Sequence, residues 1–288
     1  MIVENAPAKI NLYLHIGPVR SDGLHDLASL FAFTEKGDVI RVENNRSLSL
    51  EITGPFAHLL KDLPPENNLV LRAARALAAH TGAEHGAKIT LEKHLPIAAG
   101  IGGGSADAAA TLRALVKLWH LDISDASLAS IAFALGADIP ACLARAPVNV
   151  SGAGEVLTKG PTLPPMWACL VNPRVEMPTG PIFRAFDSAN QNPPPAALIT
   201  LETANYNLLR GGLKSARNDL EPFAQKHAPV IGNVVDMLAG MPGALISRMS
   251  GSGATCFALF SSKMSAERAS QRAHSFGWWA LASRLHVR

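Results

Sequence analysis

The stretch LPIAAGIGGGSADAAATLRALVKLW, residues 95–119, decides how this chain of 288 residues is read. Four glycines fall within the five positions from Gly100 to Gly104, and an alanine-rich helix is predicted to follow, capped by Ser105. Just before the stretch, apolar and polar residues alternate over residues 89–92, which predicts a short strand. The sequence therefore predicts a strand, a glycine-rich loop and a helix in succession.

This loop is suited to an anion. Glycine lets the backbone approach a ligand closely, and the free N–H groups at a helix start attract negative charge. Phosphate binding is the favoured interpretation, and a flexible turn before a helix is the alternative. The loop is not a Walker A motif, because no Gly-Lys-Ser/Thr follows, and Ser105 stands where a G-x-G-x-x-G motif has its last glycine.

Toward the N-terminus, apolar and polar residues alternate from Ala8 to Ile16. This period of two predicts a strand with one buried face. Lys9 and Asn11 then share the opposite face, away from the core. On the pattern alone, a solvated strand face is favoured over a site.

The other predicted elements are strands and helices in mixed order. Asn68 is predicted to cap a helix that Gly82 ends, and residues 188–195 to form a surface connection. The remaining predictions are strands at residues 38–42, 48–52, 167–173 and 255–260 and helices at residues 126–135 and 220–227. Because strands and helices do not alternate regularly, the fold class is α+β, with domains at residues 1–150 and 151–288.

Three further features are weak when taken singly. Asp138 lies just beyond a predicted helix end at Gly136, where a turn residue is the simpler interpretation. His25 follows a turn, and a lone histidine is more often structural. Gly251-Ser252-Gly253 precedes the last predicted strand and fits a close approach to a ligand or a tight turn equally well.

Composition narrows the class of protein. The formal net charge is +3 and the basic residues are scattered, which argues against a nucleic-acid surface. Three dispersed cysteines indicate neither disulfides nor a metal site. The N-terminus lacks a secretory pattern, and no window approaches the ~20 apolar residues that span a bilayer, so a cytoplasmic protein is expected.

Three motifs together resemble the GHMP kinase family. They occur in that family's order, at residues 7–12 (PAKINL), 96–107 (PIAAGIGGGSAD) and 250–254 (SGSGA). The resemblance runs over essentially the whole chain. It implies a two-domain α+β GHMP kinase fold with the active site in the cleft between the domains.

Three shorter segments resemble one branch of that family. They are residues 20–25 (RSDGLH), 136–140 (GADIP) and 218–221 (NDLE). This likeness implies transfer of the ATP γ-phosphoryl group to the 2-hydroxyl of a cytidine-diphosphate-linked methylerythritol in non-mevalonate isoprenoid biosynthesis. It also implies ATP as co-substrate, Mg²⁺, a small-molecule partner without nucleic acid or membrane, and a monomer or homodimer.

The resemblance also implies roles for individual residues. Asp138 would be the general base, with Lys9 beside it holding the carboxylate ionised. Asn11 would orient the substrate, His25 would bind the cytosine through its backbone, and Phe183 would stack on that base. The ATP-binding residues would be Asn68, near the adenine, and Pro96, Ile97, Ala98, Ala99, Gly100, Ile101, Gly102, Gly103, Gly104, Ser105 and Ala106, around the phosphates.

One position departs from the branch. Leu24 stands where a tyrosine is usual, and losing one base–aromatic stack costs on the order of 1 kcal/mol. Two alternatives stay open at this point. One is another GHMP kinase, acting on homoserine, mevalonate or a sugar; the other is a nucleotide-binding protein that has lost catalysis.

Overall fold

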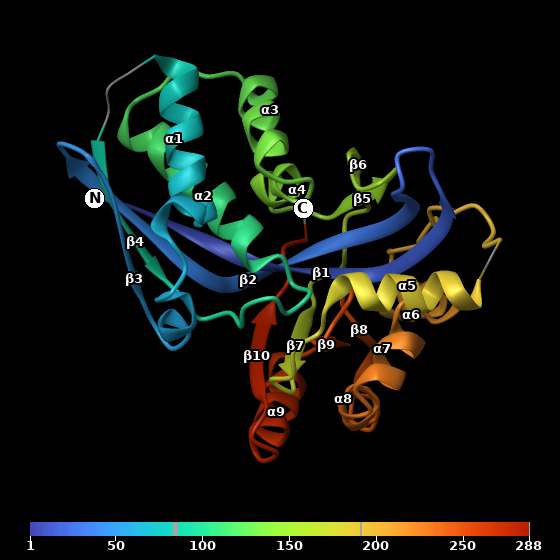
Figure 1. Ribbon diagram of the computed structural model, residues 1–288. Coiled ribbons are helices and arrows are strands. Elements are labelled where there is room, and N and C mark those ends of the chain that lie inside the picture. Colours follow the sequence, from blue (N-terminus) through green and yellow to red (C-terminus); the bar gives the residue numbers. More distant parts are fainter. Residues whose placement is uncertain (83–85, 191, 288) are drawn as a thin grey trace. The chain divides into compact units, whose positions relative to one another are not determined.

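The computed structural model describes residues 1–82, 86–190 and 192–287, and the chain forms two compact units. The first unit contains residues 1–8, 36–97 and 102–145, and the second contains residues 9–35, 98–101 and 146–288. Two long strands, β1 (Ile2–Val19) and β2 (His25–Asn45), pair with each other and contribute residues to both units (Figure 1). The units are thus interleaved in sequence, while the domain ranges 1–150 and 151–288 stay a prediction.

In the first unit, helices cover one side of a small sheet (Figure 1). Strand β4 (Gly86–Glu92) lies between β2, to which it is antiparallel, and β3 (Leu48–Thr53), to which it is parallel. The helices are α1 (Leu69–Thr81), α2 (Gly103–Leu118), α3 (Asp125–Leu135) and α4 (Ile139–Ala144), with 3₁₀ turns at Ala57–Leu60 and Pro65–Asn67.

Local signals explain why α1 forms where it does. The Asn68 side chain accepts a hydrogen bond from the backbone N–H of Val70, and Gly82 ends the helix with a left-handed φ of 65°. The predicted cap and terminator are therefore confirmed. The predicted cap of α2 is wrong, because Gly102 turns the chain at a φ of 62° and α2 begins at Gly103, before Ser105.

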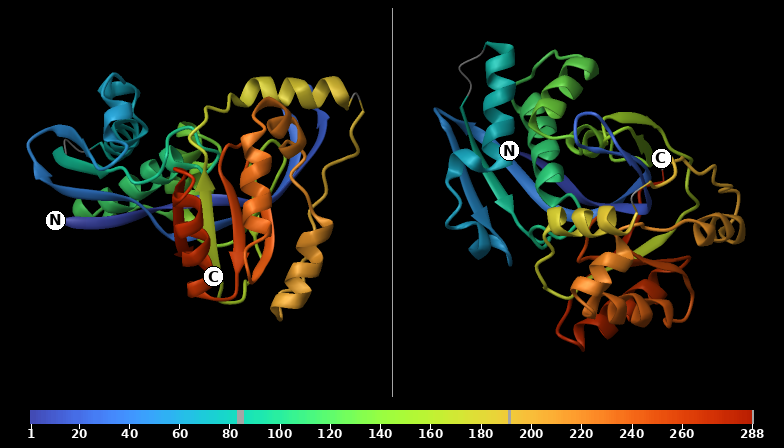
Figure 2. Two further views of the ribbon diagram at one scale, coloured as in Figure 1. Left: turned by 90° about the horizontal axis from the view of Figure 1, so that it is seen from below. Right: turned by 45° about the vertical axis from the view of Figure 1, so that its right-hand side comes forward.

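The second unit contains an antiparallel sheet of four strands in the order β10-β7-β9-β8. Helices α8 and α9 pack against it (Figure 2). Two short strands also extend from residues 29–31 of β2. The bounds are β5 (Val148–Ser151), β6 (Val156–Lys159), β7 (Trp167–Asn172), β8 (Ala244–Met249), β9 (Cys256–Phe260), β10 (Trp279–Arg284), α5 (Thr179–Ala189), α6 (Tyr206–Ser215), α7 (Glu221–His227), α8 (Val230–Ala239) and α9 (Lys263–His274).

The α+β class and most predicted elements are confirmed, with two corrections besides the cap of α2. Over residues 6–14 strand β1 is buried on both faces, and Lys9 and Asn11 are only 5% and 3% exposed, so the prediction of a solvated face is wrong. Their polar groups are satisfied by side-chain partners instead of water. The connection predicted at residues 188–195 is also partly wrong, because α5 continues to Ala189, and residue 191 lies outside the described residues.

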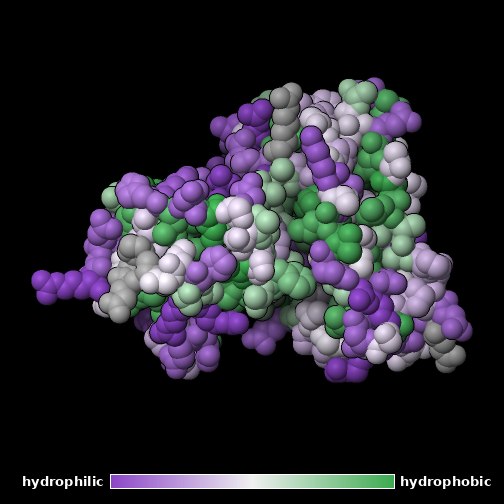
Figure 3. Space-filling view, turned by 90° about the horizontal axis from the view of Figure 1, so that it is seen from above, coloured by the Kyte–Doolittle hydropathy of each residue, from purple (hydrophilic) through white to green (hydrophobic). Residues whose placement is uncertain are grey.

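The outer surface mixes residue types. On the face in Figure 3, groups of hydrophilic residues alternate with smaller groups of hydrophobic ones. Among the residues that the structure describes, no helix is both long enough and apolar enough to cross a membrane.

Candidate active site

In the first unit, the N-terminal end of α2 is suited to bind an anion. The backbone N–H of Ala106 makes an intrahelical bond, to the carbonyl of Gly102, at 2.8 Å. The first N–H groups of a helix have no carbonyl of their own helix to pair with, and the helix dipole makes this end positive. Residues 103–105 therefore present donors suited to phosphate oxygens.

The start of α1 lies beside the start of α2 in the same unit. A Cβ built on Gly104 would come within 3.4 Å of the Leu69 side chain, which directly follows Asn68. Asn68 itself is buried, and its side-chain oxygen is committed to capping α1, 2.9 Å from the Val70 nitrogen. The structure thus brings Asn68 and the glycine loop together.

In the second unit, residues 98–101 of the loop lie against the turn between β8 and β9. Gly100 has a φ of 74°, and a Cβ there would meet the carbonyl oxygens of Gly253 and Ser250 at 2.6 Å. The Ser250 hydroxyl donates to the Gly100 carbonyl at 3.1 Å. Residues 251–253 form a tight turn, and Gly100 is needed because this turn packs directly on it.

Lys9 and Asn11 form a buried polar pair in this unit. The Lys9 ammonium donates to the Asn11 side-chain oxygen at 3.1 Å and lies 4.3 Å from the centre of the Phe31 ring. The Asn11 amide donates to the Ser29 hydroxyl at 2.9 Å, and the Lys9 backbone N–H donates to the Ile101 carbonyl at 2.9 Å. A positive charge is therefore held in a fixed place next to the loop backbone.

A second buried lysine lies behind the loop in the first unit, and the sequence analysis missed it. The Lys93 ammonium contacts Asp38 at 2.5 Å and Asp107 at 2.7 Å, and a Cβ on Gly103 would lie 3.2 Å from it. Asp38 also accepts the backbone N–H groups of His94 and Leu95. The network fixes the segment that leads into the loop. In the sequence, this network is indicated only by Asp107, an aspartate among the alanines of the predicted helix.

The charges of this network are unequal. Burial would lower the pKa of Lys93, but the two neighbouring carboxylates outweigh burial and raise it. Burial raises the pKa of Asp107 to about 8, because its Lys93 partner is shared with Asp38 and its Oδ1 atom has no hydrogen-bond partner. The ammonium therefore stays charged while one of its two carboxyls resists ionisation.

This arrangement predicts a pH-dependent loss of stability. The pKa of Asp107 is raised from 3.8 to about 8, so its protonated carboxyl contributes fully to the free energy of unfolding below about pH 4. That contribution is lost as the pH rises to about 8. Asp107→Asn should remove that loss, so the unfolding free energy of the unaltered chain should fall relative to the variant by at least about 1.4 kcal/mol between pH 5 and 9. Urea unfolding at both pH values measures this. The exposed Asp62→Asn is the control, and parallel pH profiles for the Asp107 variant and the unaltered chain would contradict the assignment.

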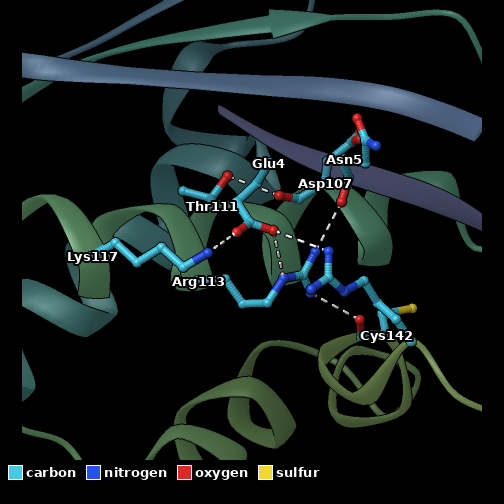
Figure 4. A network of polar contacts seen from close by, with 8 residues as sticks. Glu4, Asn5, Asp107, Thr111, Arg113, Lys117 and Cys142 are labelled. Atoms are coloured by element: carbon cyan, nitrogen blue, oxygen red, sulfur yellow. Dashed lines mark hydrogen bonds and ion pairs between the residues drawn. The ribbon is translucent and has the colours of Figure 1, made fainter. Parts of the chain in front are cut away.

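Asp138 lies at the N-cap of α4 in the first unit, and its side chain does not cap that helix. A buried network fastens α4 in place. Figure 4 shows Glu4 of β1 meeting Arg113 and Lys117 of α2, at 3.0 and 2.5 Å, while Arg113 donates to the Cys142 carbonyl of α4 at 3.0 Å.

Glu4 keeps its negative charge at the centre of this network of cationic side chains. Burial tends to raise the pKa of Glu4, but hydrogen bonds from Lys117 and Arg113 outweigh it and the pKa is lowered. The carboxylate therefore stays ionised and keeps Arg113 oriented toward α4. The position of Asp138 thus depends on residues more than twenty positions away in the sequence.

His25 and Phe183 come together in the second unit. Their ring centres are 5.5 Å apart, with planes tilted by 33°. The His25 ring nitrogens face the Gly17 carbonyl and an Asp187 oxygen, each at 2.9 Å, so this side chain is held in place by contacts within the unit. Leu24 is 55% exposed.

The comparisons with known proteins agree with these features. The model of the GHMP kinase N-terminal domain matches residues 68–145, and that of the GHMP kinase C-terminal domain matches residues 199–277. The 4-diphosphocytidyl-2-C-methyl-D-erythritol kinase of Hyphomonas neptunium is 47% identical over 97% of this chain and 95% of its own length. The enzyme of that name from Rhodospirillum rubrum is 45% identical over 99% of this chain and 92% of its own.

Solved structures place the chain in the same group. A crystal structure of 4-(cytidine 5'-diphospho)-2C-methyl-D-erythritol kinase is 31% identical, with a TM-score of 0.81 over 99% of both chains. A mevalonate kinase structure, 11% identical with a TM-score of 0.71 over 99% of this chain and 100% of that one, shares the fold. The chain belongs to the GHMP kinases, and within them to the family of 4-diphosphocytidyl-2-C-methyl-D-erythritol kinases.

Proposed function

We propose that this chain transfers the γ-phosphoryl group of ATP to the 2-hydroxyl of 4-diphosphocytidyl-2-C-methyl-D-erythritol, a step of non-mevalonate isoprenoid biosynthesis. The observation that carries the proposal is 47% identity, over nearly the full length of both chains, to a kinase named for that substrate. Within the separate units, the helix start at residues 103–105, the buried Lys9–Asn11 pair and the presence of Asp138 support it.

The proposed chemistry needs a base and fixed positive charge. Asp138 accepts the proton of the attacking hydroxyl, and the bond from the γ-phosphorus to ADP breaks as the new P–O bond forms. Lys9 offsets negative charge on the transferred group. Phosphoryl transfer depends mainly on positioning and electrostatic stabilisation, so a held ammonium and backbone donors at a helix start suit it.

Magnesium enters the proposal with ATP. Within the described part of the chain, no group of three His, Cys, Asp or Glu side chains could hold a metal ion. Mg²⁺ is usually bound through one or two carboxylates and the phosphates of the nucleotide, so it would arrive with ATP. Its chemistry would be to neutralise phosphate charge, while residues 103–105 bind the phosphates.

The cytosine is assigned to the surroundings of His25 and Phe183. Phe183→Ala should raise KM for the cytidine substrate by about 5- to 160-fold, because stacking on an aromatic ring is worth about 1–3 kcal/mol per base. KM for ATP should not change. Phe276→Ala, which removes a ring stacked on Trp278 in the same unit, is the control, and an unchanged cytidine KM in Phe183→Ala would refute the assignment.

Two competing functions make different predictions. Another GHMP kinase would phosphorylate homoserine, mevalonate or a sugar, and a nucleotide-binding protein would bind ATP without turning it over. The presence of both Lys9 and Asp138 favours catalysis over binding alone.

ADP release with magnesium and ATP tests the proposal directly. The cytidine substrate is compared with homoserine and mevalonate at equal concentrations. We expect turnover on the cytidine substrate alone. Turnover on another acceptor would overturn the substrate assignment, and ATP binding without turnover on any acceptor would favour the non-catalytic alternative.

The setting of the enzyme is also part of the proposal. Scattered basic residues support an enzyme that acts on a small molecule without nucleic acid or membrane, and we assign it to the cytoplasm. We assign it as a monomer or homodimer.

A further inference from the structure

Asn218 belongs to the NDLE segment, to which the proposed mechanism gives no role. Its side chain is 3% exposed, and its amide is fully engaged within the second unit. The amide nitrogen donates to the carbonyls of Met249 and Gly251, at 2.9 and 2.8 Å, and the amide oxygen accepts the Leu220 N–H at 3.0 Å. One side chain therefore joins the start of α7 to the end of β8.

The two carbonyls that Asn218 binds flank Ser250. This residue is the contact point between the turn and the rest of the candidate site. Its hydroxyl accepts the Asn11 backbone N–H and donates to the Gly100 carbonyl, both at 3.1 Å. The Asn11 side-chain oxygen in turn accepts a hydrogen bond from the Lys9 ammonium. Holding residues 249 and 251 thus fixes the hydroxyl on which two parts of the site converge.

From this geometry we infer that Asn218 is a positioning residue for the nucleotide, acting through Ser250 on the Gly100 loop and on Asn11. The inference rests on the proposed function, because it assigns the loop to ATP. Neighbouring contacts fit the same role: Glu221 accepts the Met249 N–H at 2.7 Å, and Asp219 accepts the Ile16 N–H at 2.8 Å. The NDLE segment therefore ties β1 and β8 together from one side.

An amide is the group that these contacts require. A carboxylate of the same shape would place one negative oxygen against the carbonyls of Met249 and Gly251, with no hydrogen to donate. When protonated, it would regain one donor. Asn218→Asp should therefore lose function as a carboxylate and recover part of it as a neutral acid, whereas Asn218→Ala should show no recovery.

The experiment measures KM for ATP and kcat between pH 6 and 8.5 for the unaltered chain, Asn218→Asp and Asn218→Ala. At pH 8.5 both variants should raise KM for ATP about tenfold, the equivalent of one or two hydrogen bonds lost. At pH 6 the Asp variant should move back toward the unaltered value. A cavity of the second unit beside Asn218 is also lined by four charged groups: Arg217, Asp219, Glu221 and Arg248. Because burial raises the pKa of Glu221, the unaltered chain and Asn218→Ala are measured over the same pH range, and only a recovery seen in Asn218→Asp alone counts for the inference.

Two controls separate positioning from general stability. Asn205→Ala removes the N-cap of α6 in the same unit, so it should lower Tm and leave KM for ATP unchanged. Ser250→Ala, which removes the shared hydroxyl, should reproduce the rise in KM even if the Asn218 variants fail to fold. If Ser250→Ala, or folded Asn218 variants, kept the normal KM and lost only thermal stability, the inference would be wrong.

Direct ATP binding by calorimetry makes this test independent of the acceptor. If the unaltered chain binds ATP but turns over no acceptor, the proposed function fails, and the same variants are compared by Kd for ATP. An unchanged Kd in Ser250→Ala would then overturn the inference. Absence of ATP binding by the unaltered chain would overturn both.

Discussion

Replacing Asp138 with Asn is expected to lower kcat by about a thousandfold, within the range of about 10²–10⁴ for loss of a general base. The amide keeps the shape of the side chain but cannot accept the hydroxyl proton. Because Asp138 does not cap α4 with its side chain, the helix should remain in place, and KM for ATP should change by less than about twofold. Steady-state ADP release gives both constants.

Asp122→Asn is the matched control for this variant. It makes the same chemical change at an exposed position of the same unit and should leave kcat unaltered. If the variant kept a kcat near that of the unaltered chain, another group must accept the proton.

Gly100→Ala should disable the loop from within the second unit. The φ of 74° is costly for alanine, by about 1–2 kcal/mol, and the new Cβ would lie 2.6 Å from two backbone carbonyl oxygens. Since neither oxygen belongs to a flexible side chain, the turn must move. We expect a loss of unfolding free energy above about 3 kcal/mol and a rise of at least about tenfold in KM for ATP.

Gly82→Ala separates the effect of backbone strain from that of a steric clash by the added Cβ. Gly82 has a similar φ of 65°, but a Cβ there would meet nothing within 4 Å. It should cost only about 1 kcal/mol and leave KM for ATP unchanged. Thermal unfolding and ATP kinetics on both variants make the comparison, and equal effects at the two glycines would show that Gly100 serves only its own backbone conformation.

Sequence predicted best what depends on near neighbours. The start and end of α1 follow from Asn68 and Gly82, each of which acts within a few residues of its own position. The glycine-rich loop was found in the same way, because its conformational freedom is a property of the residues themselves. The resemblance then suggested the roles that we propose for Lys9 and Asp138, which periodicity alone would have assigned to a strand face and a turn.

Contacts distant in sequence could not be predicted. Alternating polarity placed Lys9 in water, but its partner Asn11 is satisfied by Ser29, and the pattern holds no information about that partner. In the sequence, Lys93 is indistinguishable from a surface lysine, and only the structure shows its ion pair with Asp107. The start of α2 was misplaced for a related reason, since the left-handed backbone of Gly102 decided it instead of the capping preference of Ser105.

The interleaving of the two units has a consequence for synthesis on the ribosome. Leu14 of β1 pairs with Asn218, and both lie in the second unit. Because Asn218 is synthesised some two hundred residues after Leu14, this pairing cannot form until then. At about 5–20 residues per second, that delay is about 10–40 s. During this interval the apolar side chains of β1 cannot yet be buried by the later residues of the second unit. The nascent enzyme is therefore expected to need a chaperone most while its C-terminal half is still being made.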